Sequence, residues 1–167
     1  FMTPSDLGWM PYVTSWTQTF PDSVPDAVKT KLIALYENCF QKGVTFQRKR
    51  CKEPVGCVDI QLATSSAMIF QSILFGPESK VQFETYAEKP DLLERLVEKL
   101  WYFAFVWSIG GSCQAQDHEQ FDDFAKEMME TSGEEGSSIP LDVPGMGTSF
   151  DYFVDCTVEG GKFVPWR

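Results

Sequence analysis

The sequence has little of what enzymes and metal proteins commonly use. It contains one histidine, His118, and its 5 cysteines form no CxxC pair. The odd number and irregular spacing of the cysteines indicate neither a zinc site nor a disulfide framework, and reduced cysteines in a cytosolic protein fit best. We therefore expect no metal to be ligated by this chain.

Phosphate-binding and catalytic motifs are also missing. The chain has no GxxxxGK[ST] or GxGxxG loop, no GxSxG elbow and no HExxH pair. A Cys–His or Ser–His–Asp site would have to use His118, which we expect to be a solvated residue at the start of a helix. The carboxylate pairs Asp122–Asp123 and Glu134–Glu135 are adjacent in sequence, and adjacent residues on a helix do not share a face. The residues therefore predict no catalytic site.

Positive charge is scarce. The chain has 14 Lys and Arg against 24 Asp and Glu, a formal net charge of −10, which repels nucleic acid and anionic lipid. The longest apolar run, from Leu100 to Ile109, is about half the length that spans a bilayer. We expect no nucleic acid, no membrane and no secretory leader. The first residue is Phe, which suggests a piece excised from a longer protein.

What the sequence does have is apolar residues at helical spacing. The hydrophobic fraction is 43%, typical of a globular domain. Five stretches predict helices, near residues 11–20, 26–50, 58–75, 90–109 and 116–131. The fourth is apolar all round in its second half, which predicts the central buried helix. We expect Gly43 to kink or end the second helix, and Gly110 and Gly111 to give the fourth a left-handed cap.

The pattern changes near the C-terminus. Residues 132–149 are rich in Gly, Pro and Ser, which predicts a linker. Residues 150–158 and 163–166 then predict two strands joined by a turn at 159–162. Because an isolated hairpin is marginal in water, these strands should pack on the helices or join a sheet completed elsewhere. The predicted fold class is mainly α, a five-helix bundle with a short C-terminal β-hairpin.

Several segments, in order, resemble one family. The opening FMTPSDLGW resembles the "YMEPxxLGW" exit from the second AAA+ module of dynein heavy chains, and residues 46–53, FQRKRCKE, look like the lid segment that follows. Residues 101–111, WYFAFVWSIGG, are similar to the family's "FxxxFVWSxGG" signature, and residues 121–124, FDDF, follow them as in the family. The segments FDYF and FVPW after residue 149 look like the start of the third module. The resemblance is best to axonemal-type heavy chains.

The resemblance implies a domain organisation and a role. Residues 1–132 would be the helical AAA+ lid of the second module, 133–149 a linker, and 150–167 the opening strands of the third module. Such a lid closes on the nucleotide cleft and relays ATP-driven movement between neighbouring modules during microtubule-based motility. It would be non-catalytic. No cofactor would bind within the fragment, whereas ATP or ADP with Mg would bind in the parent motor.

Candidate site residues follow from the same resemblance. Asp59, in the first turn of the third helix, is the candidate for the lid side of the nucleotide cleft, and its simpler role is a carboxylate stabilised at a helix N-terminus. Cations at a helix C-terminus are stabilised by the helix dipole, although a basic run there would also suit an acidic neighbour or a phosphate. Exposed aromatic residues near the C-terminus would seek apolar partners. The interface candidates are Arg48, Lys49, Arg50, Phe163 and Trp166.

The implied partners are the other AAA+ modules of the same heavy chain. Dynein intermediate and light chains and microtubules would be reached through the parent and not through this segment. The expected location is the cytoplasm and cytoskeleton, in the axoneme of a cilium or flagellum. Two other classes stay open. A stand-alone helical interaction (adaptor) domain should lack stray strands at its end, and a small enzyme with an unrecognised site would have to manage with one histidine.

Overall fold

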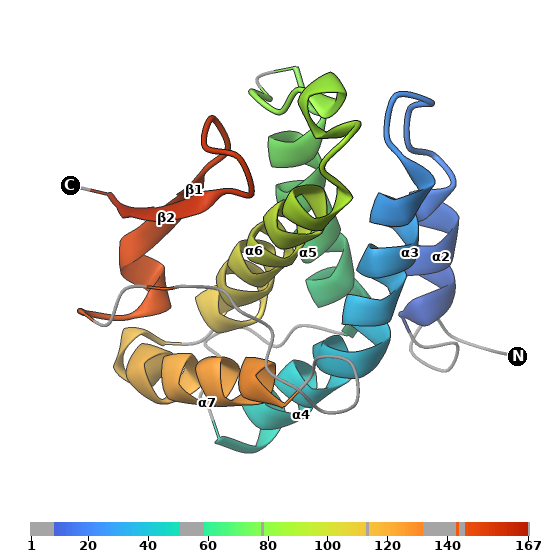
Figure 1. The fold of residues 1–167 in the computed structure, drawn as a ribbon. Coiled ribbons are helices and arrows are strands. Elements are labelled where there is room, and N and C mark those ends of the chain that lie inside the picture. Colours follow the sequence, from blue (N-terminus) through green and yellow to red (C-terminus); the bar gives the residue numbers. More distant parts are fainter. Residues whose placement is uncertain are drawn as a thin grey trace, which may run out of the picture.

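The structure is a computed structural model that describes residues 9–50, 59–77, 79–112, 114–131, 143 and 146–166. Over these ranges the chain is mainly helical with one antiparallel hairpin, as predicted. The helices are α2 (Met10–Thr17), α3 (Asp26–Leu35), α4 (Gln41–Arg50), α5 (Asp59–Leu74), α6 (Pro90–Ser108) and α7 (His118–Glu130), and the strands are β1 (Tyr152–Asp155) and β2 (Lys162–Pro165). Figure 1 shows α5 and α6 in the middle, α2 and α3 on one side, and the hairpin on the other.

One helical rod runs from Asp26 to Arg50, close to the predicted range, but it is not regular. Between α3 and α4 the backbone forms a π-helical turn, η1 (Tyr36–Phe40). The side chains of Tyr36 and Phe40 are both fully buried. We expected Gly43 to kink or end this helix, and it does not end it, because the helix continues to Arg50. A Cβ atom on Gly43 would lie 2.3 Å from the Phe105 ring, so the missing side chain admits that ring.

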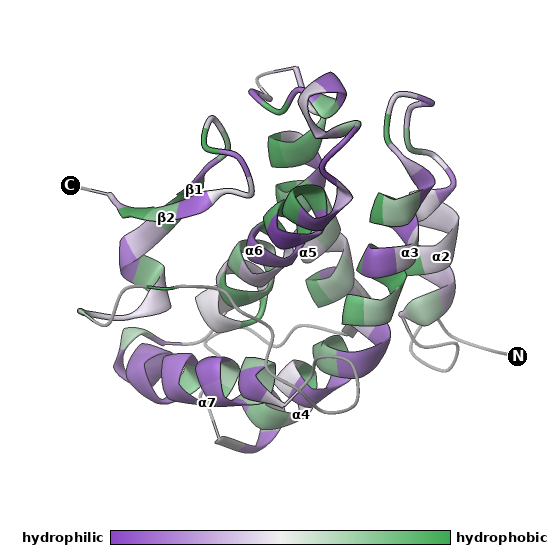
Figure 2. Cartoon of the chain, viewed as in Figure 1, coloured by the Kyte–Doolittle hydropathy of each residue, from purple (hydrophilic) through white to green (hydrophobic). Residues whose placement is uncertain are grey.

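Helix α6 is the central helix, as expected. Its first residue is Pro90, whose missing N–H would be unpaired there in any case. The helix packs against α5 and α3, and Leu100, Trp101 and Phe105 are completely buried. The Trp101 ring stacks on Phe105 with the ring centroids 5.0 Å apart. In Figure 2 the apolar colour concentrates on α5 and α6, whereas hydrophilic residues dominate the visible side of α7.

The glycines that follow α6 provide space and not a left-handed cap. The helix passes into a 3₁₀ turn, η3 (Gly110–Ser112), and neither Gly110 nor Gly111 is among the described glycines with a positive φ. A Cβ atom on Gly110 would lie 2.7 Å from the rings of both Phe121 and Phe150. The expectation of a left-handed cap is therefore wrong. Glycine is required at position 110 because two aromatic rings pack too closely to leave room for a side chain.

The predicted hairpin is present, but its first strand is shorter than the predicted 150–158, because residues 149–151 form a 3₁₀ turn, η6 (Ser149–Asp151), and β1 begins at Tyr152. β1 ends at Asp155, which lies opposite Lys162 of β2. The Asp155 carboxylate accepts hydrogen bonds from the Thr157 N–H at 3.0 Å and the Thr157 hydroxyl at 2.6 Å, and this local bonding starts the turn. The same bonds hold the pKa of the Asp155 carboxyl below its usual value. The hairpin packs on α6, where Phe163 meets Tyr102 edge-on at a centroid distance of 6.2 Å.

Two further expectations concern the whole chain. None of the helices in the described ranges is long and apolar enough to cross a membrane. The predicted linker lies mostly outside the described residues, so the domain boundaries at 132 and 150 stay predictions. The pairs Cys51 and Cys57, and Glu134 and Glu135, lie outside the described residues as well.

Candidate functional site

Polar contacts between α6 and the hairpin form the first part of the candidate site. Lys99, 8% exposed, donates from Nζ to the carbonyl oxygen of Gly161 at 2.8 Å. Tyr102 lies one turn further along the same face, and its hydroxyl is 2.8 Å from the buried hydroxyl of Ser149. α6 therefore holds the hairpin at two places, just before β1 and just before β2.

Burial also affects the chemistry of Tyr102. Desolvation raises the pKa of its phenol far above the ordinary value, and the hydrogen bond with Ser149 opposes this only in part. The phenol therefore stays protonated in the folded chain across the physiological range. A neutral hydroxyl can both donate and accept, which suits a bond between two hydroxyl groups.

Helix α7 contributes a buried carboxylate to the same place. Asp122 Oδ1 accepts from the Ser149 N–H at 2.7 Å, and Oδ2 lies 3.0 Å from Nζ of Lys126. The Asp122 side chain is 3% exposed, so both partners are needed to offset the cost of burying its charge. Its sequence neighbour Asp123 is exposed. The two acids of the FDDF motif thus have different surroundings, as expected for adjacent residues on a helix.

The turn of the hairpin is held against the start of α6. The N–H of Gly160 donates to the hydroxyl of Tyr86, in the 3₁₀ turn η2 (Phe83–Tyr86), at 3.1 Å. Gly160 has φ +79°, a region that favours glycine. Lys89 and Glu159 form an exposed ion pair at 2.7 Å, which adds little by itself. We call the contacts of Tyr86, Lys99, Tyr102 and Asp122 with residues 149–161 the junction.

His118 begins α7, as expected, but its side chain is half-buried and not fully solvated as predicted. Its ring stacks on Phe150 with centroids 4.0 Å apart and an interplanar angle of 11°. Its Nε2 atom is buried without a hydrogen-bond partner among the described residues. Trp107 contacts the same Phe150 ring edge-on at 5.3 Å. The polar neighbours of His118 in sequence gave no sign of this packing, because the ring that covers it comes from the segment before β1.

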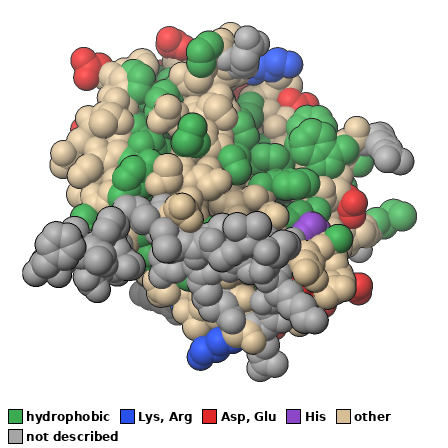
Figure 3. Space-filling model, turned by 180° about the vertical axis from the view of Figure 1, so that it is seen from behind, with side chains coloured by type: hydrophobic (Ala, Val, Ile, Leu, Met, Phe, Trp, Pro, Cys, Tyr) green, Lys and Arg blue, Asp and Glu red, His purple; other side chains and the backbone are tan. Residues whose placement is uncertain are grey.

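An exposed aromatic surface borders the junction. Trp166, 55% exposed, lies 4.9 Å from Phe153 and 6.3 Å from Phe103 between ring centroids. Phe103 in turn lies 6.4 Å from Trp107. We call these four residues the aromatic face. Figure 3 shows apolar side chains gathered on this side of the molecule, near the single histidine.

The predicted interface residues at the C-terminus have different positions. Phe163 is 4% exposed and packs inward on Tyr102, so it is part of the junction side of the hairpin. Trp166 stays on the surface, but its position is fixed. The indole Nε1 donates to the Phe150 carbonyl at 3.2 Å, and the backbone N–H donates to the Asp151 carbonyl at 3.1 Å.

The other predicted site residues lie at helix ends. α4 ends at Arg50 and α5 begins at Asp59, so these residues occupy the helix-terminal positions expected of them. Lys49 is exposed. The side chains of Arg48, Arg50 and Asp59 lie outside what the structure describes. The assignments of the basic run and of Asp59 therefore stay predictions.

The cysteines described by the structure are unlinked. Cys39 is buried and Cys156 is half-buried, and neither forms a disulfide bond. Burial raises the pKa of the Cys156 thiol to about 11. Across the described ranges, no group of three or more His, Cys, Asp or Glu side chains is placed to hold a metal ion.

A helical bundle that carries a hairpin on its central helix agrees with the fold class that the resemblance to an AAA+ lid implies. Comparison with known proteins makes this specific. Residues 32–167 match the family described as "Dynein heavy chain AAA lid domain". The chain belongs to this family.

Individual relatives agree with the family. The chain is 30% identical over 166 residues to "Dynein beta chain, ciliary" of Tripneustes gratilla, 26% over 220 to "Dynein axonemal heavy chain 14" of Homo sapiens, and 23% over 167 to "Dynein axonemal heavy chain 6" of Homo sapiens. These alignments cover 99%, 99% and 100% of the chain, but only 3%, 6% and 4% of the relatives. The axonemal and ciliary relatives support a place in the cytoskeleton of the cilium or flagellum.

Proposed function

We propose that this chain is the lid of the second AAA+ module of an axonemal dynein heavy chain, running into the third module. In this role it relays ATP-driven movement between neighbouring modules as a stiff connector. The observation that carries the proposal is the junction. The hairpin, which would open the next module, is fixed to α6 and α7 by buried polar contacts.

Stiffness follows from the cost of breaking the junction. A connector passes on a rotation only if its two ends cannot move independently. Moving the hairpin away from α6 would leave Lys99, Tyr102 and Asp122 without the partners they have on residues 149–161. Each of these hydrogen bonds contributes about 0.5–1.5 kcal/mol net, and about 1.5–3 kcal/mol where one partner is charged. The hairpin and α6 therefore move together.

The nucleotide would be held elsewhere in the parent motor. ATP or ADP with Mg would lie between this lid and the α/β part of its own module, with Asp59 at the start of α5 as the lid-side candidate. The basic run Arg48, Lys49 and Arg50 would meet an acidic surface of a neighbour. ATP hydrolysis would take place in other parts of the motor, and this chain would be non-catalytic.

The aromatic face would contact the rest of the third module. Trp166 is exposed yet held by two hydrogen bonds, which suits an anchor residue because little freedom is lost on binding. Other AAA+ modules of the same heavy chain are thus the proposed direct partners. Microtubules and the intermediate and light chains would be reached through the rest of the motor.

The test uses a heavy chain that contains this segment. The double variant Lys99→Met with Tyr102→Phe removes two junction bonds while keeping the apolar volume. We expect basal ATP turnover to persist, while microtubule gliding slows about fivefold or more, the range of ordinary coupling energies. The matched control is Lys42→Met with Tyr12→Phe, which changes the same residue types away from the junction and should glide normally.

Two results would reject the proposal. One is normal gliding by a folded junction variant, because movement would then pass by another route. The other is ATP hydrolysis by the 167-residue chain alone. The adaptor alternative is not favoured, because 99–100% of the chain aligns within much longer heavy chains.

A further inference from the structure

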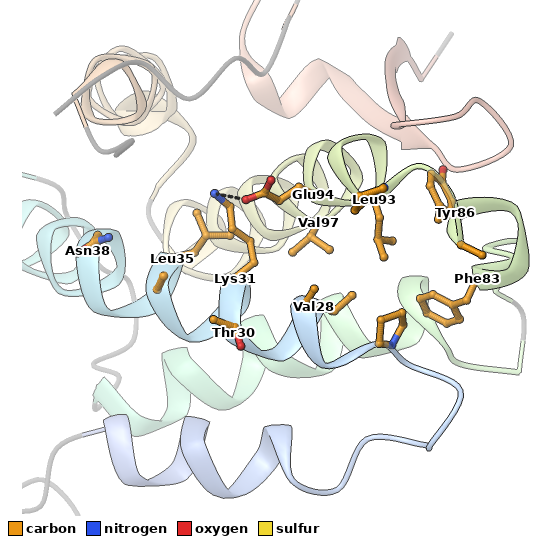
Figure 4. Close-up of a pocket in the computed structure, with 15 residues that line it drawn as sticks. Val28, Thr30, Lys31, Leu35, Asn38, Phe83, Tyr86, Leu93, Glu94 and Val97 are labelled. Carbon is orange, nitrogen blue, oxygen red and sulfur yellow. Dashed lines mark ion pairs between the residues drawn. The ribbon is translucent and has the colours of Figure 1, made fainter. Parts of the chain in front are cut away.

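A groove runs between α3 and α6, and it shares one lining residue, Tyr86, with the junction. Its volume is about 610 Å³. Figure 4 shows the side chains of α3, η2 and the start of α6 converging on it, with Lys31 and Glu94 joined by an ion pair. The residues that form its apolar floor are Val28, Leu35, Leu93 and Val97.

Small residues on α3 make the hollow. Ala27, Thr30 and Ala34 line the groove at spacings of three and four, which places them on one face of the helix. Ala87, after η2, also lines the groove and is exposed. A helix face of small side chains next to a row of larger ones leaves a channel that larger side chains of a partner can fill.

The groove is long and narrow in the way that suits a helix. Its lining along α3 and η1 extends from Pro25, just before α3, to Asn38 in η1, a length of roughly 20 Å at 1.5 Å per residue. An amphipathic helix binds in such a groove with apolar residues at i, i+3, i+4 and i+7. About 14 residues of helix would span it.

The charged residues in and beside the groove, which we call its rim, are mostly acidic. Glu94 lines the groove, and the exposed Glu84, Glu88 and Asp91 are next in sequence to lining residues. Lys89 is also next to a lining residue, but it pairs with Glu159. The cation that lines the groove is Lys31, which lies between Glu94 at 3.4 Å and the buried Glu98 at 3.1 Å. The rim therefore attracts positive charge on an incoming partner.

We propose that the α3–α6 groove binds a basic amphipathic helix of a partner protein. The apolar stripe of that helix would pack on Val28, Leu93 and Val97. Its flanking Lys or Arg residues would lie against Glu94 and the neighbouring acids. The proposal does not depend on the relay role, because apart from Tyr86 the groove and the junction have no residue in common.

The first experiment uses a synthetic probe and the 167-residue chain. The probe is a fluorescent helical peptide of Leu and Lys, about 14 residues long, with Leu at i, i+3, i+4 and i+7. A second peptide has Glu in place of every Lys. We expect the Lys peptide to bind about tenfold or more tightly than the Glu peptide, and to weaken as salt rises.

Variants locate the binding. Ala87→Trp fills the groove from an exposed position and should weaken the Lys peptide about tenfold. Ala115→Trp makes the same change at an exposed site outside the groove and should bind normally. Glu94→Gln should weaken binding and reduce its salt dependence, whereas Asp123→Gln, on exposed α7 surface, should not. Circular dichroism checks that each variant is folded.

Several outcomes would overturn the proposal. Equal binding of the Lys and Glu peptides would reject the charge argument, and equal binding by folded Ala87→Trp would reject the groove. Self-association of the chain that Ala87→Trp abolishes would show that a second copy occupies the site. Binding of a small apolar dye that Ala87→Trp blocks, without any peptide binding, would identify a small-molecule pocket instead.

Discussion

Gly43 sets the distance between two helices by having no side chain. The Phe105 ring occupies the space in which a Cβ atom on Gly43 would lie, 2.3 Å from the Cε1 and Cζ atoms. Gly43→Ala should destabilise the chain by about 1–3 kcal/mol, the cost of overpacking a core, although Ala is about 1 kcal/mol better than Gly within a helix. Urea unfolding followed by circular dichroism measures the change.

The control for this variant is Gly111→Ala. A Cβ atom there would come no closer than 3.9 Å to another atom, in Trp107. Its stability should change by less than about 0.5 kcal/mol, as at ordinary surface sites. Equal effects of the two variants would mean that the close contact with Phe105 is not what Gly43 provides.

The neighbours Asp122 and Asp123 offer a second comparison of single residues. Asp122→Ala removes the acceptor of the Ser149 N–H and the partner of Lys126, so it should cost about 1.5–3 kcal/mol, as for hydrogen bonds to charged groups. Asp123→Ala changes an exposed carboxylate and should stay within about 0.5 kcal/mol. Thermal unfolding of both variants decides, and a larger loss in Asp123→Ala would contradict the assigned roles.

At the scale of the helices and strands, the sequence predicts regular features better than contacts between distant segments. α6 is predictable because its second half is apolar all round. The π turn η1 is not, because Tyr36 and Phe40 have the same apolar character in either helix geometry and tertiary packing selects one. The stacking of His118 on Phe150 also joins segments that no local pattern connects.

The junction could have been suspected in part. Lys99 directly precedes the apolar run of a predicted central helix and Tyr102 lies within it, and a buried polar group needs a partner. The sequence could not identify Gly161 as the partner of Lys99 or Ser149 as the partner of Tyr102, because only the tertiary fold brings these distant segments together. Trp166, by contrast, was predicted as an interface residue from its type and position, and it is exposed; its contact with a partner stays a prediction.

Loss of one junction bond should loosen the hairpin more than the bundle. Lys99→Met removes the donor to the Gly161 carbonyl, so amide hydrogen exchange in β1 and β2 should speed up by an amount equivalent to about 1–2 kcal/mol. Exchange in α5 should change less. Lys42→Met is the matched control. Uniform acceleration across the whole chain would show that Lys99 supports the bundle and not the hairpin in particular.

For the whole molecule, the buried tyrosine and cysteine side chains, which stay protonated in the folded chain, predict that the folded state loses stability at alkaline pH. Burial raises the pKa values of Tyr36 and Tyr102 far above normal, and that of Cys156 to about 11. The unfolded chain releases these protons near pH 9–10, so it binds fewer protons than the folded chain above that pH. The stability they contribute is therefore complete below about pH 9 and falls as pH rises towards the folded pKa values.

Urea midpoints measured from pH 8 to 11.5 check this prediction. Each buried tyrosine should cost roughly 2 kcal/mol at pH 11.5, since one pH unit beyond the unfolded pKa is worth about 1.4 kcal/mol. Tyr102→Phe should be less stable than the parent at pH 8, because Ser149 loses its partner, but should lose less stability between pH 10 and 11.5. If the urea midpoints of Tyr102→Phe fall with pH in parallel with those of the parent chain, Tyr102 is not a source of the alkaline loss of stability.

The aromatic face gives a prediction that distinguishes an independent domain from a segment that packs against the next module of a motor. Trp166→Ser removes an exposed side chain that contacts Phe103 and Phe153, so in the 167-residue chain it should cost about 1 kcal/mol or less. In a polypeptide that continues into the next module the cost should exceed about 2 kcal/mol, as for a buried anchor at an interface. Met146→Ser, at a residue 82% exposed, is the control and should behave alike in both. If Trp166→Ser has the same small effect in the longer polypeptide, the aromatic face stays in solvent and does not contact the next module.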